Sequence, residues 1–427
     1  GIGKPIDMEE GMMFAFTKIQ DYLIENSEGW FFRCMNINTE RDPEKLKWEM
    51  LPEGDNGLKN ENLGTVNAEQ NIVQLDDGTI YCMHRTISGF PAESFSHDRG
   101  ESWTLPVIPK YYTGNNIKHP RACPRIWKTK SGKYLFWQHN HGGWDFNGRN
   151  PAWISGGIEK NGKIMWSQPE ILLYEDEFVK RMSYPDLIEQ NGEYWITETN
   201  KENGRCHEIP ADFLNMLWSQ FSIEAIASGG LIFEANANTL KSSTNHTIGS
   251  LSDGSGVPGF TIDMVLALTD LSPDQNILTI KGDNNLEIIL QTKEFGAIEV
   301  VIDDEEEEIS WTSDPGILRA FGDNSIAVSV DNNARIIQFV VNGVVNNGGK
   351  FRQFGWKRFE DYLKLPGEST LTMGKLKTGA IRGVPGSVKS LRIYNRSLMN
   401  TEIIGNHRMD KNKYDTKVLP EQYSVNQ

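Results

Sequence analysis

Cysteine is scarce in this sequence, and its spacing excludes one common kind of metal site. The chain of 427 residues contains four cysteines, at positions 34, 82, 123 and 206. No two of them have the CxxC spacing of a thiolate zinc site. Four thiols permit disulfides without establishing them, so the redox compartment stays open. We expect no metal and no cofactor.

Long apolar runs are missing as well. No run reaches the roughly 20 residues that a helix needs to cross a bilayer. No basic stretch leads into an apolar run, so the chain shows no signal peptide. We therefore expect no membrane span.

Positive charge is in deficit. The chain has 43 Lys and Arg against 58 Asp and Glu, which gives a formal net charge of −15. Such a surface repels phosphate backbones, so we expect no nucleic-acid partner. If the substrate is itself anionic, cationic side chains must be concentrated in its site. The acidic run at 305–308 is interpreted as a solvated loop or strand end.

Short strand patterns dominate what is present. Apolar and aromatic runs are separated by Gly, Asn and Asp turn pairs such as Asp77-Gly78 and Asn161-Gly162, a pattern typical of all-β proteins. One amphipathic helix is predicted over 210–222, with Pro210 in its first turn. The predicted strands cover 12–16, 22–25, 30–35, 71–75, 79–84, 134–138, 194–199, 260–266, 286–290, 298–302, 325–330 and 336–341.

A weak repeat runs through the first half. Residues 96–103 match the pattern S-x-D-x-G-x-x-W in full, and degenerate copies occupy 42–48 and 159–166. Their tryptophans, Trp48, Trp103 and Trp166, are 55 and 63 residues apart (103 − 48 and 166 − 103). That period suits one four-stranded propeller blade with long loops. Asp98 can accept hydrogen bonds from turn amides, and Gly100 can adopt a positive φ.

This motif resembles the Asp box of the sialidase (BNR-repeat) superfamily. The resemblance implies a β-propeller over residues 1–222. It also implies that the box is a structural turn, so Asp98 has no catalytic role. About four blades are readable, whereas sialidase propellers have six. Either blades are missing on the N-terminal side, or the count from sequence is low.

Residues 226–410 have a different character. Their alternating strands, the hairpin around Asn342-Gly343 and the ending at 386–404 resemble laminin-G domains. This resemblance implies a two-sheet jelly roll of the laminin-G/concanavalin A type. The whole chain is then an all-β protein, an Asp-box propeller followed by a concanavalin A-like β-sandwich. Residues 411–427 are interpreted as a polar tail.

Histidine and arginine gather in the propeller half. Arg121, Arg125 and Arg149 can hold a carboxylate through paired hydrogen bonds. Histidines at such positions can transfer protons, and the candidates are His119, His139 and His141. Trp144 follows as a residue that can contact a sugar. The alternative is that these side chains only tie loops together.

The segment from Arg181 to Glu198 resembles the part of sialidases that carries the tyrosine nucleophile. By this resemblance Tyr184 is the nucleophile, and Glu69 and Glu198 are candidate carboxylate partners. Arg85, Arg149 and Arg205 are candidates for binding a substrate carboxylate. The acid aspartate and the N-terminal arginine motif of sialidases are not identified. The alternative for Tyr184 is a buried aromatic with a satisfied hydroxyl.

The leading hypothesis is a sialidase-like exo-glycosidase acting on an acidic glycan. The second is a propeller polysaccharide lyase acting on a uronate-containing polysaccharide, which also needs His, Tyr and Arg. The third is a glycan-binding protein without catalysis. Each implies a glycan or polysaccharide ligand and a secreted or periplasmic location, with no signal present in this chain; the oligomeric state stays open. Tryptophans offered as stacking platforms are Trp127, Trp137, Trp144 and Trp153.

Overall fold

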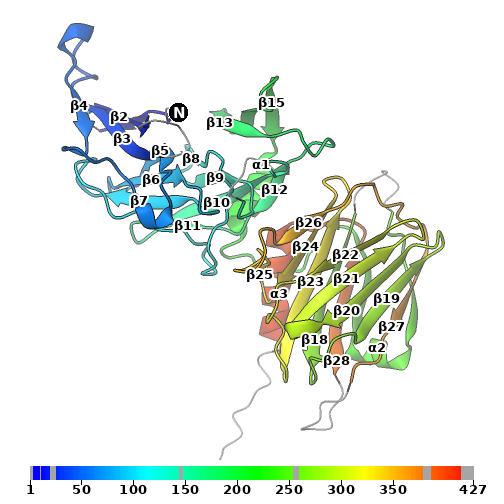
Figure 1. Cartoon of the computed structure of the whole chain (residues 1–427). Coiled ribbons are helices and arrows are strands. Elements are labelled where there is room, and N and C mark those ends of the chain that lie inside the picture. The colour runs from blue at the N-terminus through cyan, green and yellow to red at the C-terminus, as the bar shows by residue number, and fades with distance from the viewer. Residues whose placement is uncertain are drawn as a thin grey trace, which may run out of the picture. The chain divides into compact units, whose positions relative to one another are not determined.

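The computed structural model describes residues 3–9, 11–19, 26–143, 148–252, 259–377 and 386–414 (Figure 1). Strands dominate these residues, so the expectation of an all-β chain is confirmed. The chain divides into two compact units. The first is Gly1–Phe221 with Arg352–Phe354, and the second is Ser222–Phe351 with Gly355–Gln427.

Four antiparallel sheets follow one another along the described part of the first unit. Each consists of strands that are consecutive in the chain, as short turns between strands require. The first two sheets contain β1 (Ile6–Met8), β2 (Gly11–Ile19), β3 (Ser27–Cys34) and β4 (Trp48–Leu51), then β5 (Ala68–Gln74), β6 (Ile80–Arg85) and β7 (Ala92–Ser96). The last two contain β8 (Arg125–Lys128), β9 (Tyr134–Gln138), β10 (Ala152–Lys160), β11 (Lys163–Trp166) and β12 (Glu170–Leu173), then β13 (Ser183–Gln190), β14 (Glu193–Thr199) and β15 (Gly204–Ile209).

Apolar side chains join each sheet of the first unit to the next. Phe31 and Ile72 belong to a core shared by the first and second sheets. Tyr81 and Trp166 belong to a core shared by the second and third. The third core combines strands of the last two sheets with helix α1 (Ala211–Ser219), whose Leu217 is fully buried. The sheets therefore pack in sequence order, and burial of these aromatics stabilises the stack.

Sequence alternation predicted these strands well. Six of the seven runs predicted before residue 210 coincide with strands of the structure, and the seventh, 22–25, lies outside the described residues. The helix predicted over 210–222 is α1, somewhat shorter than expected. In the box turn, Asp98 Oδ1 accepts hydrogen bonds from Ser96 Oγ at 2.8 Å and Ser102 N at 2.9 Å. Gly100 has a φ of +94°, the positive value that its place in the motif predicts.

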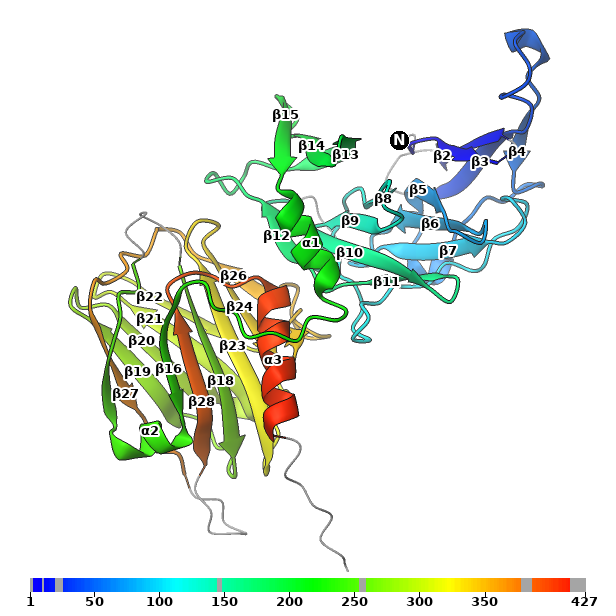
Figure 2. The same ribbon diagram turned by 180° about the vertical axis from the view of Figure 1, so that it is seen from behind.

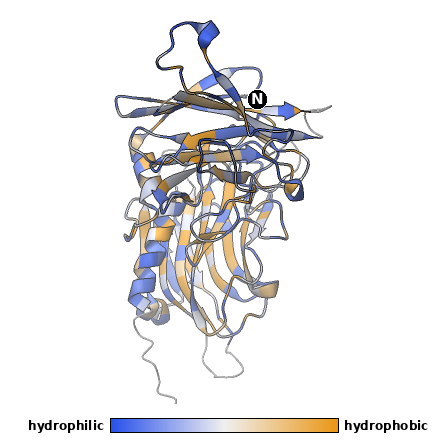
Figure 3. Cartoon of the chain, turned by 90° about the vertical axis from the view of Figure 1, so that its left-hand side faces the viewer, coloured by the Kyte–Doolittle hydropathy of each residue, from blue (hydrophilic) through white to orange (hydrophobic). Residues whose placement is uncertain are grey.

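The second unit contains two antiparallel sheets within its described residues. One has the strand order β16-β28-β18-β23-β24-β25, with β26 on β24, and the other has the order β17-β27-β19-β20-β21-β22. Both sheets contribute to one apolar core, and Figure 3 shows the hydrophobic residues (orange) along these strands. The strands of the first sheet are β16 (Leu231–Asn236), β18 (Phe260–Leu268), β23 (Gly322–Asp331), β24 (Ile336–Val341), β25 (Val344–Val345), β26 (Trp356–Arg358) and β28 (Ser387–Tyr394); those of the second are β17 (Asn245–Ile248), β19 (Asn276–Gly282), β20 (Glu287–Lys293), β21 (Ala297–Asp303), β22 (Glu308–Thr312) and β27 (Ser369–Met373).

Two helices accompany these sheets. The short α2 (Ala237–Ser242) follows β16 directly, and α3 (Asn400–Tyr414) contacts β23 and β24 on the face away from the shared core (Figure 2). By the resemblance to laminin-G domains, 401–404 would be the closing turn of the jelly roll, and 411–427 were interpreted as a polar tail. The helix instead continues through 411–414, while 415–427 lie outside the described residues.

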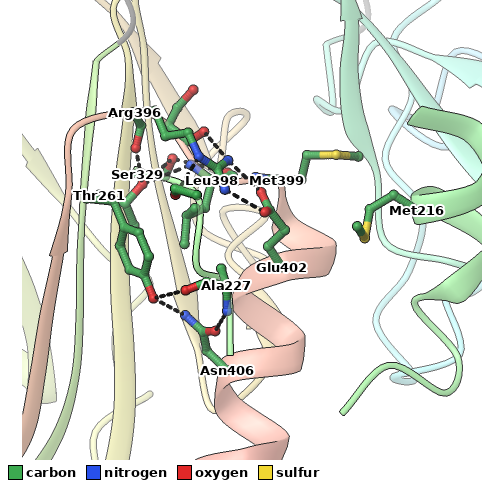
Figure 4. A network of polar contacts seen from close by, with 12 residues as sticks. Met216, Ala227, Thr261, Ser329, Arg396, Leu398, Met399, Glu402 and Asn406 are labelled. Carbon is green, nitrogen blue, oxygen red and sulfur yellow. Dashed lines mark hydrogen bonds and ion pairs between the residues drawn. The ribbon is translucent and has the colours of Figure 1, made fainter. Parts of the chain in front are cut away.

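Polar contacts hold the first turns of α3 against the sheet (Figure 4). Arg396 pairs with Glu402 through two hydrogen bonds, of 2.8 and 2.6 Å. Asn406 donates to the hydroxyl oxygen of Tyr394 at 3.1 Å and accepts from the backbone N–H of Ala227 at 2.7 Å. These side chains are too polar to be recognised as a buried helix face, which explains why sequence periodicity missed the helix.

Other expectations concern single features of the chain. All four cysteines are free, and only Cys206 is exposed. The acidic run at 305–308 is exposed between β21 and the start of β22, as expected. In the part of the chain that the structure describes, no helix combines the length and the apolar character needed to cross a membrane.

Candidate active site

Two β-bulges place Glu69 and Tyr184 in unusual backbone conformations. The pairing of β5 with β6 shifts register between Ala68 and Asn71, and Glu69 has a φ of +55°. The pairing of β13 with β14 shifts between Ser183 and Asp186, and Tyr184 has a φ of +51°. A positive φ at a residue other than glycine is sparsely populated and costs about 1–3 kcal/mol. Bulges of this kind re-aim side chains and are frequent beside active sites.

The two bulged residues meet through their side chains. The Tyr184 hydroxyl donates to Glu69 Oε1 at 3.2 Å, and Arg85 Nη1 donates to Glu69 Oε2 at 3.1 Å. Arg85 and Glu69 are each only 7% exposed at the side chain, whereas Tyr184 is 49% exposed. Burial and the Glu69 carboxylate raise the pKa of Tyr184. The phenol is therefore protonated at neutral pH, with a carboxylate in place to accept its proton.

Arg149 adds a second guanidinium to this group. It precedes β10 and donates to Ser183 Oγ at 3.1 Å and to the carbonyl oxygen of Arg121 at 2.6 Å. Burial and the neighbouring charge of Arg85 lower the pKa of Arg149 to about 10, and Tyr184 and Glu69 act in the opposite direction. Arg149 is still cationic at neutral pH. Two buried positive charges therefore lie near the exposed phenol, and their field favours a ligand that carries a carboxylate.

The site is a shallow depression of about 30 Å³. Its lining includes Tyr184, Glu69 and Cys123. Burial and the Glu69 carboxylate raise the pKa of the Cys123 thiol to about 12. A larger cavity of about 480 Å³ lies at the opposite ends of β5, β8 and β13, where it is lined by residues such as Trp127 and Lys128. We place the candidate site at the smaller depression, because the tyrosine–carboxylate pair lies there.

Arg121 and Arg125 are engaged with the protein itself. For Arg121 these contacts are made by the backbone: its N–H donates to Gly143 O at 3.1 Å, and its carbonyl oxygen accepts from Arg149, while its side chain is 6% exposed. Arg125 donates from Nη1 to Asn71 Oδ1 at 2.6 Å and from Nε to Pro185 O at 3.3 Å. Sequence reasoning missed Asn71 and Ser183, because no motif marks residues that act by supporting a neighbour.

The three candidate histidines, His119, His139 and His141, lie in loops and are buried. His119 and His139 are each 1% exposed, and each contacts a backbone carbonyl, Ala122 O at 3.1 Å and Pro151 O at 3.3 Å. Burial lowers the pKa of His119 to about 3 and lowers the pKa of His139 well below its ordinary value. Both rings are therefore neutral and out of reach of a substrate. His141 contacts Gly148 O at 2.8 Å, and both His139 and His141 lie beyond the end of β9.

A second charged cluster lies on β14 and β15. Glu198 Oε1 accepts from Arg205 Nε at 2.5 Å and lies 3.0 Å from His207 Nε2, and Arg205 also pairs with Glu175. Burial raises the pKa of Glu198. Arg205 and Glu198 thus bind each other, whereas Tyr184 binds Glu69. No group of three or more His, Cys, Asp or Glu side chains that could hold a metal occurs among the described residues.

The expectation that several tryptophans serve as stacking platforms for a sugar needs correction. Trp137 and Trp153 are fully buried, so their rings cannot offer a face to a sugar, and Trp127 is only 6% exposed, at the wall of the larger cavity. Trp127 and Trp137 belong to the core between the third and fourth sheets, a role that aromatic content alone could not distinguish from a binding platform. Trp144 lies outside the described residues.

Comparisons with known proteins gave matches only among solved structures. No protein-family model and no curated protein matches the chain. A Trypanosoma rangeli sialidase in complex with sialic acid is similar over 95% of this chain and 83% of its own, with 10% identity and a TM-score of 0.28. The CBM40 of Ruminococcus gnavus IT-sialidase, bound to α2,3 sialyllactose, is similar over 42% of this chain and 99% of its own, with 16% identity and a TM-score of 0.29. Scores at this level carry no argument about activity, so the chemistry of the site depends on its own side chains.

Proposed function

We propose that the first unit is a sialidase-like exo-glycosidase acting on an acidic glycan. The observation that carries this proposal is the hydrogen bond between the exposed Tyr184 phenol and the buried Glu69 carboxylate. In this proposal the four sheets are blades of an Asp-box propeller, and the second unit is a laminin-G/concanavalin A-like jelly roll. The location is secreted or periplasmic.

The pair suits attack on an anomeric carbon that carries a carboxylate. A neutral phenol approaches such a centre without the repulsion that an anionic nucleophile would meet. As the phenolic oxygen bonds to the anomeric carbon and the bond to the leaving oxygen breaks, Glu69 takes the phenolic proton. Arg85 and Arg149 are 5% and 4% exposed, so in this proposal they favour the substrate carboxylate through their positive charge behind the phenol and not through direct contact. The general acid that protonates the leaving oxygen is not among these four side chains.

The two alternative functions have less support. A lyase that uses His119 or His139 would need an accessible imidazole, and both rings are buried against backbone carbonyls. A glycan-binding role based on aromatic platforms would need exposed rings, and Trp127, Trp137 and Trp153 are buried. The tyrosine–carboxylate pair provides a proton transfer that a hydrolase needs and that binding alone does not need, so it favours the hydrolase.

The test is hydrolysis of fluorogenic α-sialosides, with uronic-acid glycosides alongside. We expect Tyr184→Phe and Glu69→Gln each to lower kcat by about 10²–10⁴-fold, because each removes one partner of the proton transfer. The matched control is Tyr174→Phe at the end of β12, a tyrosine with similar exposure (41%). It should keep wild-type kcat.

A Tyr184→Phe enzyme with unchanged kcat would remove the tyrosine from the mechanism. Ultraviolet absorbance from an unsaturated product on uronate polysaccharides would instead establish the lyase. Binding of sialosides without release of free sugar would leave only the binding function.

A further inference from the structure

The two bulges of the site are connected by a relay of two side chains. Asn71 Nδ2 donates to the carbonyl oxygen of Glu69 at 2.8 Å. Arg125 Nη1 donates to Asn71 Oδ1 at 2.6 Å, and Arg125 Nε donates to the carbonyl oxygen of Pro185 at 3.3 Å. The relay therefore runs from the backbone of Glu69, through β8, to the residue directly after Tyr184.

The relay is well placed to fix the backbone at both ends. Asn71 is 3% exposed, and its amide also donates to Pro124 O at 2.6 Å, next to Arg125 in the chain. An amide with three partners has a single orientation, and a bond from a guanidinium is stronger than one between neutral groups. The positive φ values of Glu69 and Tyr184 persist only if the surroundings hold them.

We propose that Arg125 and Asn71 are positioning residues that set the separation of the Tyr184 hydroxyl from the Glu69 carboxylate. Arg125 does not bind a substrate carboxylate, although its residue type suggested that role. The effect on turnover rests on the proposed function, but the effect on geometry does not. Misplacement of a reacting group by about 1 Å can lower a rate by about 10²-fold.

The experiment compares Arg125→Leu and Asn71→Ala with the control Lys128→Ala. Lys128 bonds to Gln74 O at 3.0 Å and to Asp76 at 2.7 Å, so it also joins β8 to the β5 segment, but at the end away from the site. Crystal structures, melting temperatures and steady-state kinetics on a fluorogenic α-sialoside are measured for each variant. Arg125→Lys is included because it keeps the charge but loses the fork that reaches two acceptors.

In Arg125→Leu and Asn71→Ala we expect the Tyr184–Glu69 separation to grow from 3.2 Å to beyond hydrogen-bond distance. We expect kcat to fall about 10–100-fold with KM changed less than about threefold. Added guanidinium should partly restore kcat in Arg125→Leu, and Arg125→Lys should be intermediate. The Lys128→Ala protein should keep both the separation and kcat.

Two outcomes would overturn the inference. One is an Arg125→Leu structure in which the pair stays at its wild-type distance. The other is a raised KM with unchanged kcat, which would make Arg125 a substrate ligand. If the wild-type protein hydrolyses no acidic glycoside, the proposed function fails, and the separations in the variant structures still decide the inference. If Arg125→Leu does not fold, Asn71→Ala and Arg125→Lys decide it by the same distance.

Discussion

Burial decides how much each tryptophan of the repeat contributes. Trp166 is 1% exposed and donates to the hydroxyl oxygen of Tyr81 at 3.2 Å. Trp103 is half-buried and stacks on Phe31 with a centroid distance of 4.3 Å. Trp48 is 42% exposed and only borders Phe14 and Phe32. The same position in three copies of one motif therefore has three different environments.

Substitution of each tryptophan by alanine should follow this order. We expect a loss in the free energy of unfolding of about 4–5 kcal/mol for Trp166→Ala and about 2–3 kcal/mol for Trp103→Ala. Trp48→Ala should cost less than about 1 kcal/mol. Urea unfolding of the three variants measures these values. If Trp103→Ala were the most destabilising of the three, the match to the motif, and not burial, would govern stability.

The sequence allowed the candidate residues of this site to be named, but it did not allow their contacts or their burial to be predicted. Tyr184, Glu69, Arg85 and Arg149 were named as candidates through the resemblance to sialidases, and hydrogen bonds and charge interactions connect them. The sequence could not tell that Arg125 faces Asn71, because that contact joins two strands 54 residues apart. Nor could it tell that His119 and His139 are buried, since polar loop residues are usually exposed.

At the scale of elements, α3 depends on buried charge. Arg392 on β28 forms two hydrogen bonds with Asp410 on α3, of 2.7 and 2.8 Å, and a third with Asp263 on β18 at 3.2 Å. All three side chains are at most 4% exposed. The alternation of apolar residues predicted the strands of this unit, but a helix anchored by Asp and Asn has no such stripe to read.

Removal of Asp410 should therefore loosen the helix. We expect Asp410→Ala to lower the free energy of unfolding of the second unit by about 3–5 kcal/mol, because it leaves Arg392 short of a buried partner. The control is Glu402→Ala, which breaks the ion pair with Arg396. The side chains of Arg396 and Glu402 are 31% and 15% exposed, so this pair is less buried. It should cost about 1–2 kcal/mol. Thermal unfolding compares the two, and equal losses would contradict the role of burial.

At the scale of the whole molecule, the two units hold buried groups with opposite responses to acid. In the first unit, burial lowers the pKa of His84 and of His119 to about 3, and it lowers the pKa of His139 well below its ordinary value. In the second unit, burial raises the pKa of Asp263 to about 6, although Arg392 opposes the shift. Burial also raises the pKa of Glu93 and of Glu198 in the first unit, which partly offsets its histidines.

The sign of each group's contribution to the free energy of unfolding depends on whether its pKa is lower or higher in the folded chain than in the unfolded chain. A histidine with a depressed pKa stabilises the fold above pH 6.5, and this contribution is lost as the pH falls toward 3, since the unfolded chain binds the proton first. When the pH falls from 7 to 5, each such histidine should lower the free energy of unfolding by about 2 kcal/mol. An aspartate with a raised pKa has the opposite sign, because its contribution is present below pH 4 and is lost as the pH rises through 6. Asp263 should therefore raise the free energy of unfolding by about 1 kcal/mol over the same change from pH 7 to pH 5.

Calorimetry of the whole chain at pH 7 and pH 5 should then show two responses to acid. We expect the transition of the first unit to move down in temperature on acidification, and that of the second unit to move less or to rise. Two variants assign them: His84→Gln removes one buried imidazole and should reduce the downward shift of the first transition, and Asp263→Asn should remove the acid stabilisation of the second. Neither change alters net charge at pH 7 by more than one unit, so a general charge effect cannot mimic both. A His84→Gln protein with the wild-type shift between pH 7 and pH 5 would show that another group controls the acid response of the first unit.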